Sequence, residues 1–372
     1  MARPVSTYRL LAVGADAATV GVTAACFAVP PIVLAVGFGR WTERHHPAIL
    51  FALGLAIGAA SAFALVVAEQ IWAIALATTA LGIGHTSATI GGQSIMAQAD
   101  SSIARIGRFG TLTTVSALGQ IVGPVVGGVM IGHTEQPSLP ATSSALLVAA
   151  WLLVAGLPAT AIAMRTRIQS STVREGKPER VWGLLRRRGM PAALMTSFSA
   201  KSGVDLLLVY VPLLGVVVGL TSSQVGILLG ISSSGALLAR AATPFFVRRI
   251  PSVRLTVVAT VVAATCLLVL AVSGDIAPMM VAMSVLGFAL GLSQTTTMDW
   301  VVNLVDDTSR GSALGLRVAT NRVGQAFILA VAGAVSGAWG VQAAFVLLAV
   351  VMYVTAASGV ANARRGPQSA GA

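Results

Sequence analysis

The chain has 372 residues, of which 56% are hydrophobic and only 10% are charged, and its mean hydropathy is +0.86. A water-soluble domain of this length carries far more charge, so the composition excludes a soluble protein and predicts a membrane protein. The net charge of +12 does not indicate a nucleic-acid partner, because most of the basic residues lie in short connections between apolar spans.

Apolar runs of about 20 residues, the length that crosses a bilayer, recur eleven times along the chain. They predict eleven transmembrane helices and an all-α fold. The predicted spans are 17–39, 48–68, 71–98, 110–131, 142–164, 191–217, 223–247, 253–273, 277–303, 311–335 and 339–361.

The basic residues fall on alternate connections. One set comprises Arg40 and Arg44, Arg105 and Arg108, eight Lys or Arg from Arg165 to Arg188, Arg248, Arg249 and Arg254, Arg310, and Arg364 and Arg365. The connections between these carry no Lys or Arg. The positive-inside rule makes the first set cytoplasmic, which predicts a multi-pass protein of the cytoplasmic (inner) membrane with a cytoplasmic C-terminus. The N-terminal tail, with Arg3 and Arg9, is the exception and is predicted outside.

The sequence repeats itself without gaps at an offset of 205 residues. The offset pairs Val20-Gly21 with Val225-Gly226, Leu81-Gly82 with Leu286-Gly287, and Gly119-Gln120 with Gly324-Gln325. Many transporters are built from such repeats, with the substrate site at the repeat interface near mid-membrane. The repeat predicts two related halves around such a site.

The repeat and the charge pattern divide the chain into four parts. We expect an N-terminal helical bundle at 1–164, a basic cytoplasmic linker at 165–190, a C-terminal bundle at 191–361 and a cytoplasmic tail at 362–372. The span that begins near Pro191 has its repeat partner at 191 − 205 = −14, before Met1. We therefore expect the first helix to be missing, with residues 1–12 matching only its outer end, because of either a start site assigned too late or a truncated product.

A ridge of glycines runs along the predicted span 110–131. Gly119, Gly123 and Gly127 recur every fourth residue, which on a helix leaves a bare face that another backbone can approach closely. Pro124 removes one helical hydrogen bond and tends to bend the helix. Such a ridge alone indicates helix packing. The full string, Gly-x-x-x-Gly-Pro-x-x-Gly-Gly ending at Gly128, resembles the fifth-helix antiporter motif of the major facilitator superfamily, which is associated mainly with exporters.

The connection after the first span carries a second resemblance. Gly39-Arg40-Trp41-Thr42-Glu43-Arg44-His45-His46 is similar to the superfamily signature between its second and third helices, although Glu43 stands for the usual aspartate and the two histidines replace later glycine and basic residues. The resemblance implies that Glu43 and Arg44 form a charge relay that locks one conformation. The alternative is a plain cytoplasmic loop.

The resemblance implies a superfamily fold of two pseudo-symmetric six-helix bundles with 11 of 12 helices present. It also implies a monomeric secondary transporter that works by alternating access. The antiporter motif favours proton-coupled export of a small amphipathic organic compound, with protons and membrane lipid as further partners. The alternatives are uptake of a small polar metabolite and a truncated, non-transporting paralogue or sensor.

The sequence contains no motif typical of a metal site or of a phosphate-binding loop. No His, Cys and carboxylate residues have metal-ligand spacing, and Cys26 and Cys266 lie in apolar spans, where cysteine acts as a small hydrophobe. No Gly-x-x-x-x-Gly-Lys-Ser/Thr string is present to bind phosphates. We therefore expect no metal, no cofactor and no enzyme activity, and an ion gradient rather than ATP as the energy source.

Ionisable side chains within membrane spans are costly and indicate function. Lys201 and Asp205 lie four residues apart, on one helix face near mid-membrane. Burial favours the protonated acid and the neighbouring ammonium favours the carboxylate, so protonation of Asp205 can depend on which side the site faces. The resemblance implies that this helix lines the central cavity. The alternative is a self-neutralising pair kept for packing specificity.

His85 stands in the middle of the span 71–98, which the resemblance also makes cavity-lining. Histidine changes charge near neutral pH and can relay a proton or bind substrate; the alternative is a packing role. Gln93, Gln294 and Asp299 add polarity to this span and to its repeat partner.

Asp299 lies toward the cytoplasmic end of its span, and Arg317 and Arg322 lie early in the next one at similar depth. This placement predicts an inter-helix ion pair, either one that opens and closes during transport or a static one.

Overall fold

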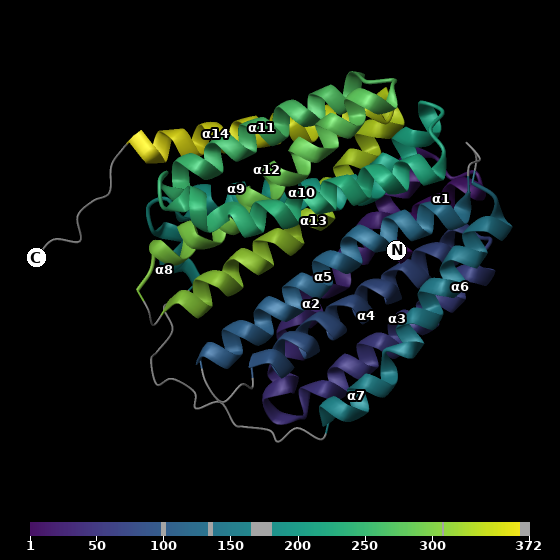
Figure 1. Cartoon of the computed structure of the whole chain (residues 1–372), viewed down its shortest axis with the longest axis horizontal. Coiled ribbons are helices and arrows are strands. Elements are labelled where there is room, and N and C mark those ends of the chain that lie inside the picture. Colours follow the sequence, from purple (N-terminus) through teal and green to yellow (C-terminus); the bar gives the residue numbers. More distant parts are fainter. Residues whose placement is uncertain (98–101, 133–136, 165–180, 307–308, 365–372) are drawn as a thin grey trace, which may run out of the picture. The chain divides into compact units, whose positions relative to one another are not determined.

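The computed structural model describes residues 1–97, 102–132, 137–164, 181–306 and 309–364. All the regular structure in these ranges is α-helical (Figure 1). Within the described ranges, eleven segments are long and apolar enough to cross a membrane, which confirms the predicted spans and the all-α membrane fold. The helices are α1 Ala2–Ala12, α2 Ala17–Arg44, α3 Pro47–Val67, α4 Ile71–Ala97, α5 Ser102–Ile131, α6 Leu139–Ala155, α7 Leu157–Met164, α8 Val181–Arg186, α9 Met190–Val217, α10 Ser222–Val247, α11 Ser252–Val272, α12 Ile276–Asn303, α13 Arg310–Trp339 and α14 Gln342–Arg364.

The prediction of a loop beginning at Gly39 was wrong, because α2 continues to Arg44. The residues from Arg40 to Arg44 include good helix formers and no proline, so nothing in them stops the helix. The helix ends where His45 and His46 take extended backbone conformations ahead of Pro47. A residue that precedes proline is disfavoured in the helical conformation, which explains the break at this point.

One predicted span is two helices. Within 142–164 the chain turns at Gly156, so that α6 ends at Ala155 and α7 begins at Leu157. Pro158 is the second residue of α7, where proline is tolerated because the first N–H groups of a helix have no partner within it.

The chain forms two compact units. The first comprises Met1–Arg174 and Val211–Gly230, and the second comprises Glu175–Tyr210 and Ile231–Ala372. The end of α9 and the start of α10 therefore belong with the first unit, whereas most of both helices belongs with the second.

The helix boundaries repeat at the offset seen in the sequence. Helices α2, α3 and α4 begin at 17, 47 and 71, and α10, α11 and α12 begin at 222, 252 and 276, a difference of 205 in each case. Helix α1 ends at Ala12 and α9 at Val217, again 205 apart. Helix α1 thus matches the last 11 residues of α9 in register.

The two repeats also pack their helices together at equivalent residues. A Cβ on Gly82 of α4 would fall on the carbonyl oxygen of Phe27 in α2, and a Cβ on Gly287 of α12 would fall on that of Ser232 in α10. The two pairs are related by 205, since 82 + 205 = 287 and 27 + 205 = 232. Glycine at these positions lets one helix backbone touch the next.

Arg9, the exception to the charge pattern, is buried inside the first unit. Only 2% of it is exposed. Its guanidinium donates to the carbonyl oxygens of Val66 (2.7 Å) and Ala68 (2.9 Å) at the end of α3, and to Leu139 O (2.9 Å) and Ser143 Oγ (2.7 Å) at the start of α6. A cation is stabilised by the carbonyls at a helix C-terminus. Arg9 therefore ties α1 to two other helices.

Candidate functional site

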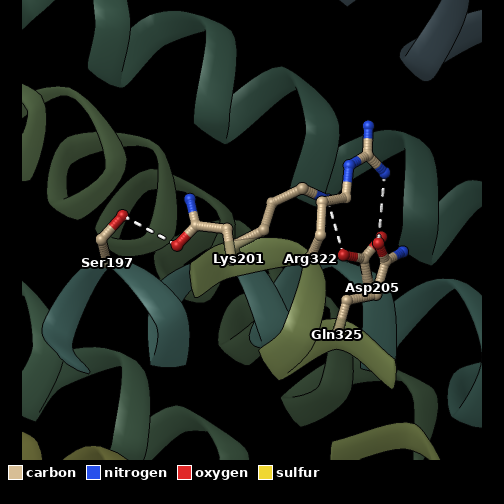
Figure 2. A network of polar contacts seen from close by, with 6 residues as sticks. Ser197, Lys201, Asp205, Arg322 and Gln325 are labelled. Atoms are coloured by element: carbon tan, nitrogen blue, oxygen red, sulfur yellow. Dashed lines mark hydrogen bonds and ion pairs between the residues drawn. The ribbon is translucent and has the colours of Figure 1, made fainter. Parts of the chain in front are cut away.

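The Lys201–Asp205 pair forms as its spacing predicts. In the middle of α9, Lys201 Nζ lies 2.6 Å from Asp205 Oδ2 (Figure 2). The two partners differ in exposure, because 32% of the lysine side chain is exposed and only 1% of the aspartate side chain. The carboxylate is thus enclosed by protein, and the ammonium is the member of the pair that other molecules can reach.

Helix α13 contributes polar side chains beside this pair (Figure 2). Ser197 Oγ donates to Asn321 Oδ1 over 3.1 Å, and Arg322 Nη1 donates to Gln325 Oε1 over 3.3 Å. Gln325 is buried, with 1% of it exposed. We call this group the α9–α13 network; its members are Ser197, Lys201, Asp205, Asn321, Arg322 and Gln325.

Sequence reasoning identified Lys201, Asp205 and Arg322 as site candidates but not Asn321 and Gln325. A signal for them existed, because the two amides lie four residues apart and therefore share a helix face. Polar residues in that spacing within an apolar span match the pattern that singled out Lys201 and Asp205.

Asp299 and Arg317 have different partners among the described residues, so the static form of the predicted ion pair is not formed, and the form that opens and closes stays a prediction. The Asp299 carboxylate accepts hydrogen bonds from Ser252 Oγ at the start of α11 and from Asn303 Nδ2 over 3.2 Å. Arg317 Nη2 instead donates to the carbonyl of Gln294 over 2.8 Å and to Thr297 Oγ1 over 3.2 Å. Neutral groups close to the carboxylate and to the guanidinium took the place of the expected partner.

The glycine ridge of α5 packs closely within the first unit. A Cβ at Gly123 would lie 2.8 Å from the Met1 nitrogen, and one at Gly127 would lie 3.2 Å from Val5 Cγ2, so both glycines face the α1 end of the chain. Gly128 faces the start of α10, and a Cβ on the opposing Gly226 would lie 2.6 Å from the carbonyl oxygen of Pro124. The close approach expected of this ridge is present at Gly123 and Gly127 but not at Gly119, where no described atom lies within 4 Å of the place a Cβ would take, and α5 continues through Pro124.

The family model of the Major Facilitator Superfamily matches residues 4–315. The chain belongs to this superfamily. Solved structures of other transporters share its fold, and two of them illustrate the likeness. A mutant of the nucleoside transporter NupG has a TM-score of 0.82 at 15% identity, over 97% of this chain and 94% of that one. The inward-facing, unoccupied bacterial homolog of the human lysosomal transporter Spinster has a TM-score of 0.72 at 14% identity, over 98% and 93%. No curated protein matches the sequence.

Membership of the Major Facilitator Superfamily makes the protein a multi-pass membrane transporter and not an enzyme. At 14–15% identity the solved structures establish the shared fold alone.

Helix α4 of this transporter carries two of the predicted residues, and both are exposed. The His85 ring centroid lies 5.8 Å from that of Phe27. The Arg3 guanidinium carbon lies 4.4 Å from the centroid of the same phenylalanine ring. Gln93 is exposed further along the helix. Gln294 of α12 is half-buried, and its backbone carbonyl oxygen accepts a hydrogen bond from Arg317.

The superfamily signature at the end of α2 lies largely outside the described residues. Gly39, Glu43 and Arg44 fall on the helical backbone, but their surroundings are not described. The charge relay expected of Glu43 and Arg44 therefore stays a prediction.

Proposed function

We propose that the protein couples proton movement to the export of a small amphipathic organic compound across the inner membrane, by alternating access. The observation that carries the proposal is the ion pair in the middle of α9, where Asp205 is buried and Lys201 is half-buried. Asp205 is the proposed coupling group.

The physical argument rests on the cost of a buried charge. A carboxylate inside a membrane protein is tolerated only when a cation pairs with it or a proton neutralises it. Asp205 has the first partner in Lys201, at 2.6 Å. If Lys201 moves away, a proton can take its place. Asp205 would then alternate between a carboxylate paired with Lys201 and a protonated, uncharged acid. This alternation would link proton binding to the movement of Lys201.

The glycine string of α5 supports the export direction, because this motif in the superfamily is associated mainly with exporters. Gly128 lets α5 pack closely against the start of α10. Such close packing is what we expect of a motif that restrains the movement of one helix against another. A second candidate is proton-coupled uptake of a small polar metabolite. The α9–α13 network favours it, because amide, hydroxyl and charged groups gathered at one place suit a polar compound.

The test uses everted vesicles with an imposed pH gradient and a labelled panel of organic cations, neutral compounds and carboxylic acids. We compare the wild-type chain with Asp205→Asn, which keeps the size of the side chain and removes its titration. We expect the gradient-dependent part of accumulation to fall to the level of vesicles without the protein. Accumulation of a compound would indicate export, and gradient-dependent depletion would indicate uptake.

The matched control is Asp16→Asn, at the exposed start of α2 outside the membrane spans. We expect it to transport as the wild type does. Full gradient-driven transport by Asp205→Asn would contradict the proposed coupling role. Absence of transport by the wild-type chain itself would favour the non-transporting alternative.

A further inference from the structure

Two arginines in membrane-spanning helices of the second unit, Arg240 of α10 and Arg317 of α13, have no carboxylate partner among the described residues. Within the same ranges, Arg240 makes no hydrogen bond or ion pair, and Arg317 donates only to the carbonyl of Gln294 and the hydroxyl of Thr297. A neutral acceptor does not compensate the charge of a guanidinium. An uncompensated charge inside a membrane is costly, and such residues often mark a ligand site.

Contacts between α10 and α12 fix the position of Arg240. Ala236, Arg240 and Thr243 are four and three residues apart, so they share one face of α10. On one side of Arg240, a Cβ on Gly291 of α12 would lie 2.7 Å from the Cα of Ala236. On the other side, Thr243 Oγ1 lies 2.9 Å from Thr295 Oγ1 of α12. Arg240 is therefore on the face of α10 that packs against α12, at the level of residues 291–295.

Helix α13 meets α12 at the same level. Arg317 Nη2 donates to Gln294 O over 2.8 Å and to Thr297 Oγ1 over 3.2 Å. Gln294 is the chain neighbour of Thr295, which contacts α10. The two arginines also lie equally deep, about 10 Å from the nearer end of their helices, since 247 − 240 = 7 and 317 − 310 = 7.

The side of α12 between these two contacts is partly exposed. Met298 lies four residues after Gln294 and three after Thr295, so it shares this side of the helix, and it is 47% exposed. Gln294, Arg240 and Arg317 are half-buried. A molecule that reaches this side of α12 thus comes close to two cationic side chains and one amide.

We propose that Arg240 and Arg317 together bind an anionic oxygen group, carboxylate or phosphate, beside α12. A guanidinium binds such groups through charge-assisted hydrogen bonds, often two in parallel. The Arg317 guanidinium has donor capacity left, because its Nε has no hydrogen-bond partner in the described part of the chain. The anion is either a soluble organic acid or phosphate, or the headgroup of an anionic lipid. The inference goes beyond the proposed function and does not require coupling by Asp205.

The test measures ligand binding to the purified full chain in detergent, by equilibrium dialysis and by thermal unfolding. The soluble probes are 3-phenylpropionate, its amide, 3-phenylpropylamine and inorganic phosphate, and the lipid probes are phosphatidylglycerol and phosphatidylcholine in mixed micelles. We expect at least one of the anions to raise the unfolding temperature, and the amide, the amine and phosphatidylcholine not to. Binding of the acid or of phosphate indicates a soluble anion, whereas stabilisation by phosphatidylglycerol alone indicates a lipid headgroup.

The variants are Arg240→Gln and Arg317→Gln, which remove the charge and keep a polar side chain. We expect each to weaken anion binding about tenfold or more, the usual effect of losing a hydrogen bond to a charged group. Arg240→Gln removes no hydrogen bond or ion pair of the described residues, so it should fold and be at least as stable as the wild type without ligand. It decides the test if Arg317→Gln does not fold.

The matched control is Arg254→Gln, at an exposed position near the start of α11 in the same unit. It makes the same change in net charge, and anion binding should equal that of the wild type. Equal weakening by Arg254→Gln would overturn the inference, because net charge alone would then explain the effect.

Three other results would also overturn it: no anion binding, the amine or amide binding as tightly as the acid, or undiminished anion binding by folded Arg240→Gln. Failure of the proposed function is a separate outcome, because it is read from gradient-driven transport. Anion binding without such transport would support this inference and contradict the proposed function alone.

Discussion

The dipeptide Gly-Gln occurs at equivalent positions of the two repeats and has different surroundings in each. At Gly119 on α5, nothing in the described part of the chain lies within 4 Å of the place a Cβ would take, and Gln120 is exposed. At Gly324 on α13 a Cβ would overlap the ring of Phe198, and Gln325 is buried in the α9–α13 network. Identical residues in identical helical positions thus acquire different roles from their neighbours.

The close contacts of α4 and α12 show the opposite behaviour. Gly82 meets Phe27 and Gly287 meets Ser232, and in both copies the atom that a Cβ would strike is a backbone carbonyl oxygen. The neighbouring residue types differ, but the contact does not depend on them because it is made by backbone. Backbone contacts are therefore shared by the two repeats, and side-chain chemistry is specific to each.

The largest predicted effect tests the shared contact. Gly82→Ala and Gly287→Ala each force a methyl group onto a backbone carbonyl that cannot rotate away, so we expect each to lose about 3 kcal/mol of unfolding free energy, the upper part of the usual range for overpacking. Unfolding in mixed detergent micelles measures both losses. If one of the two variants had a stability within about 0.5 kcal/mol of wild type, the two contacts would not be equivalent. A change that small is typical of substitutions on the protein surface and not of a close backbone contact.

A smaller and unequal effect is predicted for the glycines of the repeated dipeptide. Gly324→Ala should lose about 1–2 kcal/mol, less than Gly287→Ala, because the obstacle is the Phe198 side chain, which can shift. Gly119→Ala should lose nothing and can gain up to about 1 kcal/mol, because alanine favours the helix. The same unfolding measurement compares them.

A double substitution tests whether Phe198 is the reason for the expected cost of Gly324→Ala. In a Phe198→Leu background the ring is gone, so Gly324→Ala should cost less than it does alone, and the difference is the coupling energy of the two positions. Equal costs in the two backgrounds would show that Phe198 is not the obstacle.

The spans could be predicted from the sequence because the bilayer requires long apolar segments, and each of the eleven carries that signal by itself. The break at Gly156 and the extension of α2 to Arg44 were missed for a different reason. Both depend on backbone conformation over two or three residues, and hydropathy averaged over a span does not register it.

The candidate site was only partly accessible from sequence. The Lys201–Asp205 pair could be predicted because its partners share one helix, four residues apart. The contact of Ser197 with Asn321 joins two helices 124 positions apart in the chain, and no local pattern specifies it. The same limit applies to the partners of Asp299 in this structure. Similar depth in neighbouring spans suggested an arginine, whereas the rotation of each helix placed Ser252 against the carboxylate.

Helices α2 and α10 occupy equivalent places in the two repeats, and their starts are capped by different chemistry at equivalent residues. Asp16 Oδ1 accepts from the Thr19 nitrogen over 2.9 Å at the start of α2. At the start of α10, Thr221 Oγ1 accepts from the Gln224 nitrogen over 3.3 Å, and Gln224 Oε1 accepts from the Thr221 nitrogen over 2.8 Å, a reciprocal capping box. Both pairs are related by 205, since 16 + 205 = 221 and 19 + 205 = 224.

Only one of these caps titrates, and this difference gives the smallest predicted effect. Hydrogen bonds from Thr19 hold the pKa of Asp16 below its usual value of 3.8. A carboxyl whose pKa is lower in the folded state contributes stability above its unfolded pKa and loses it as the pH falls through the folded value. Asp16→Asn, which keeps a good cap, should therefore match the wild type at pH 7 and lose less stability below pH 4.

Replacement by alanine removes each cap entirely. Asp16→Ala and Thr221→Ala should each lose about 1 kcal/mol at pH 7. Below pH 4 the loss in Asp16→Ala, measured against wild type at the same pH, should shrink, because the wild-type carboxyl is then protonated and caps less well. The loss in Thr221→Ala should stay constant, because a hydroxyl does not titrate in this range. A loss in Asp16→Ala that is independent of pH would mean that the Asp16 charge adds nothing to the cap. The two repeats would then be equivalent at this position despite their different residues.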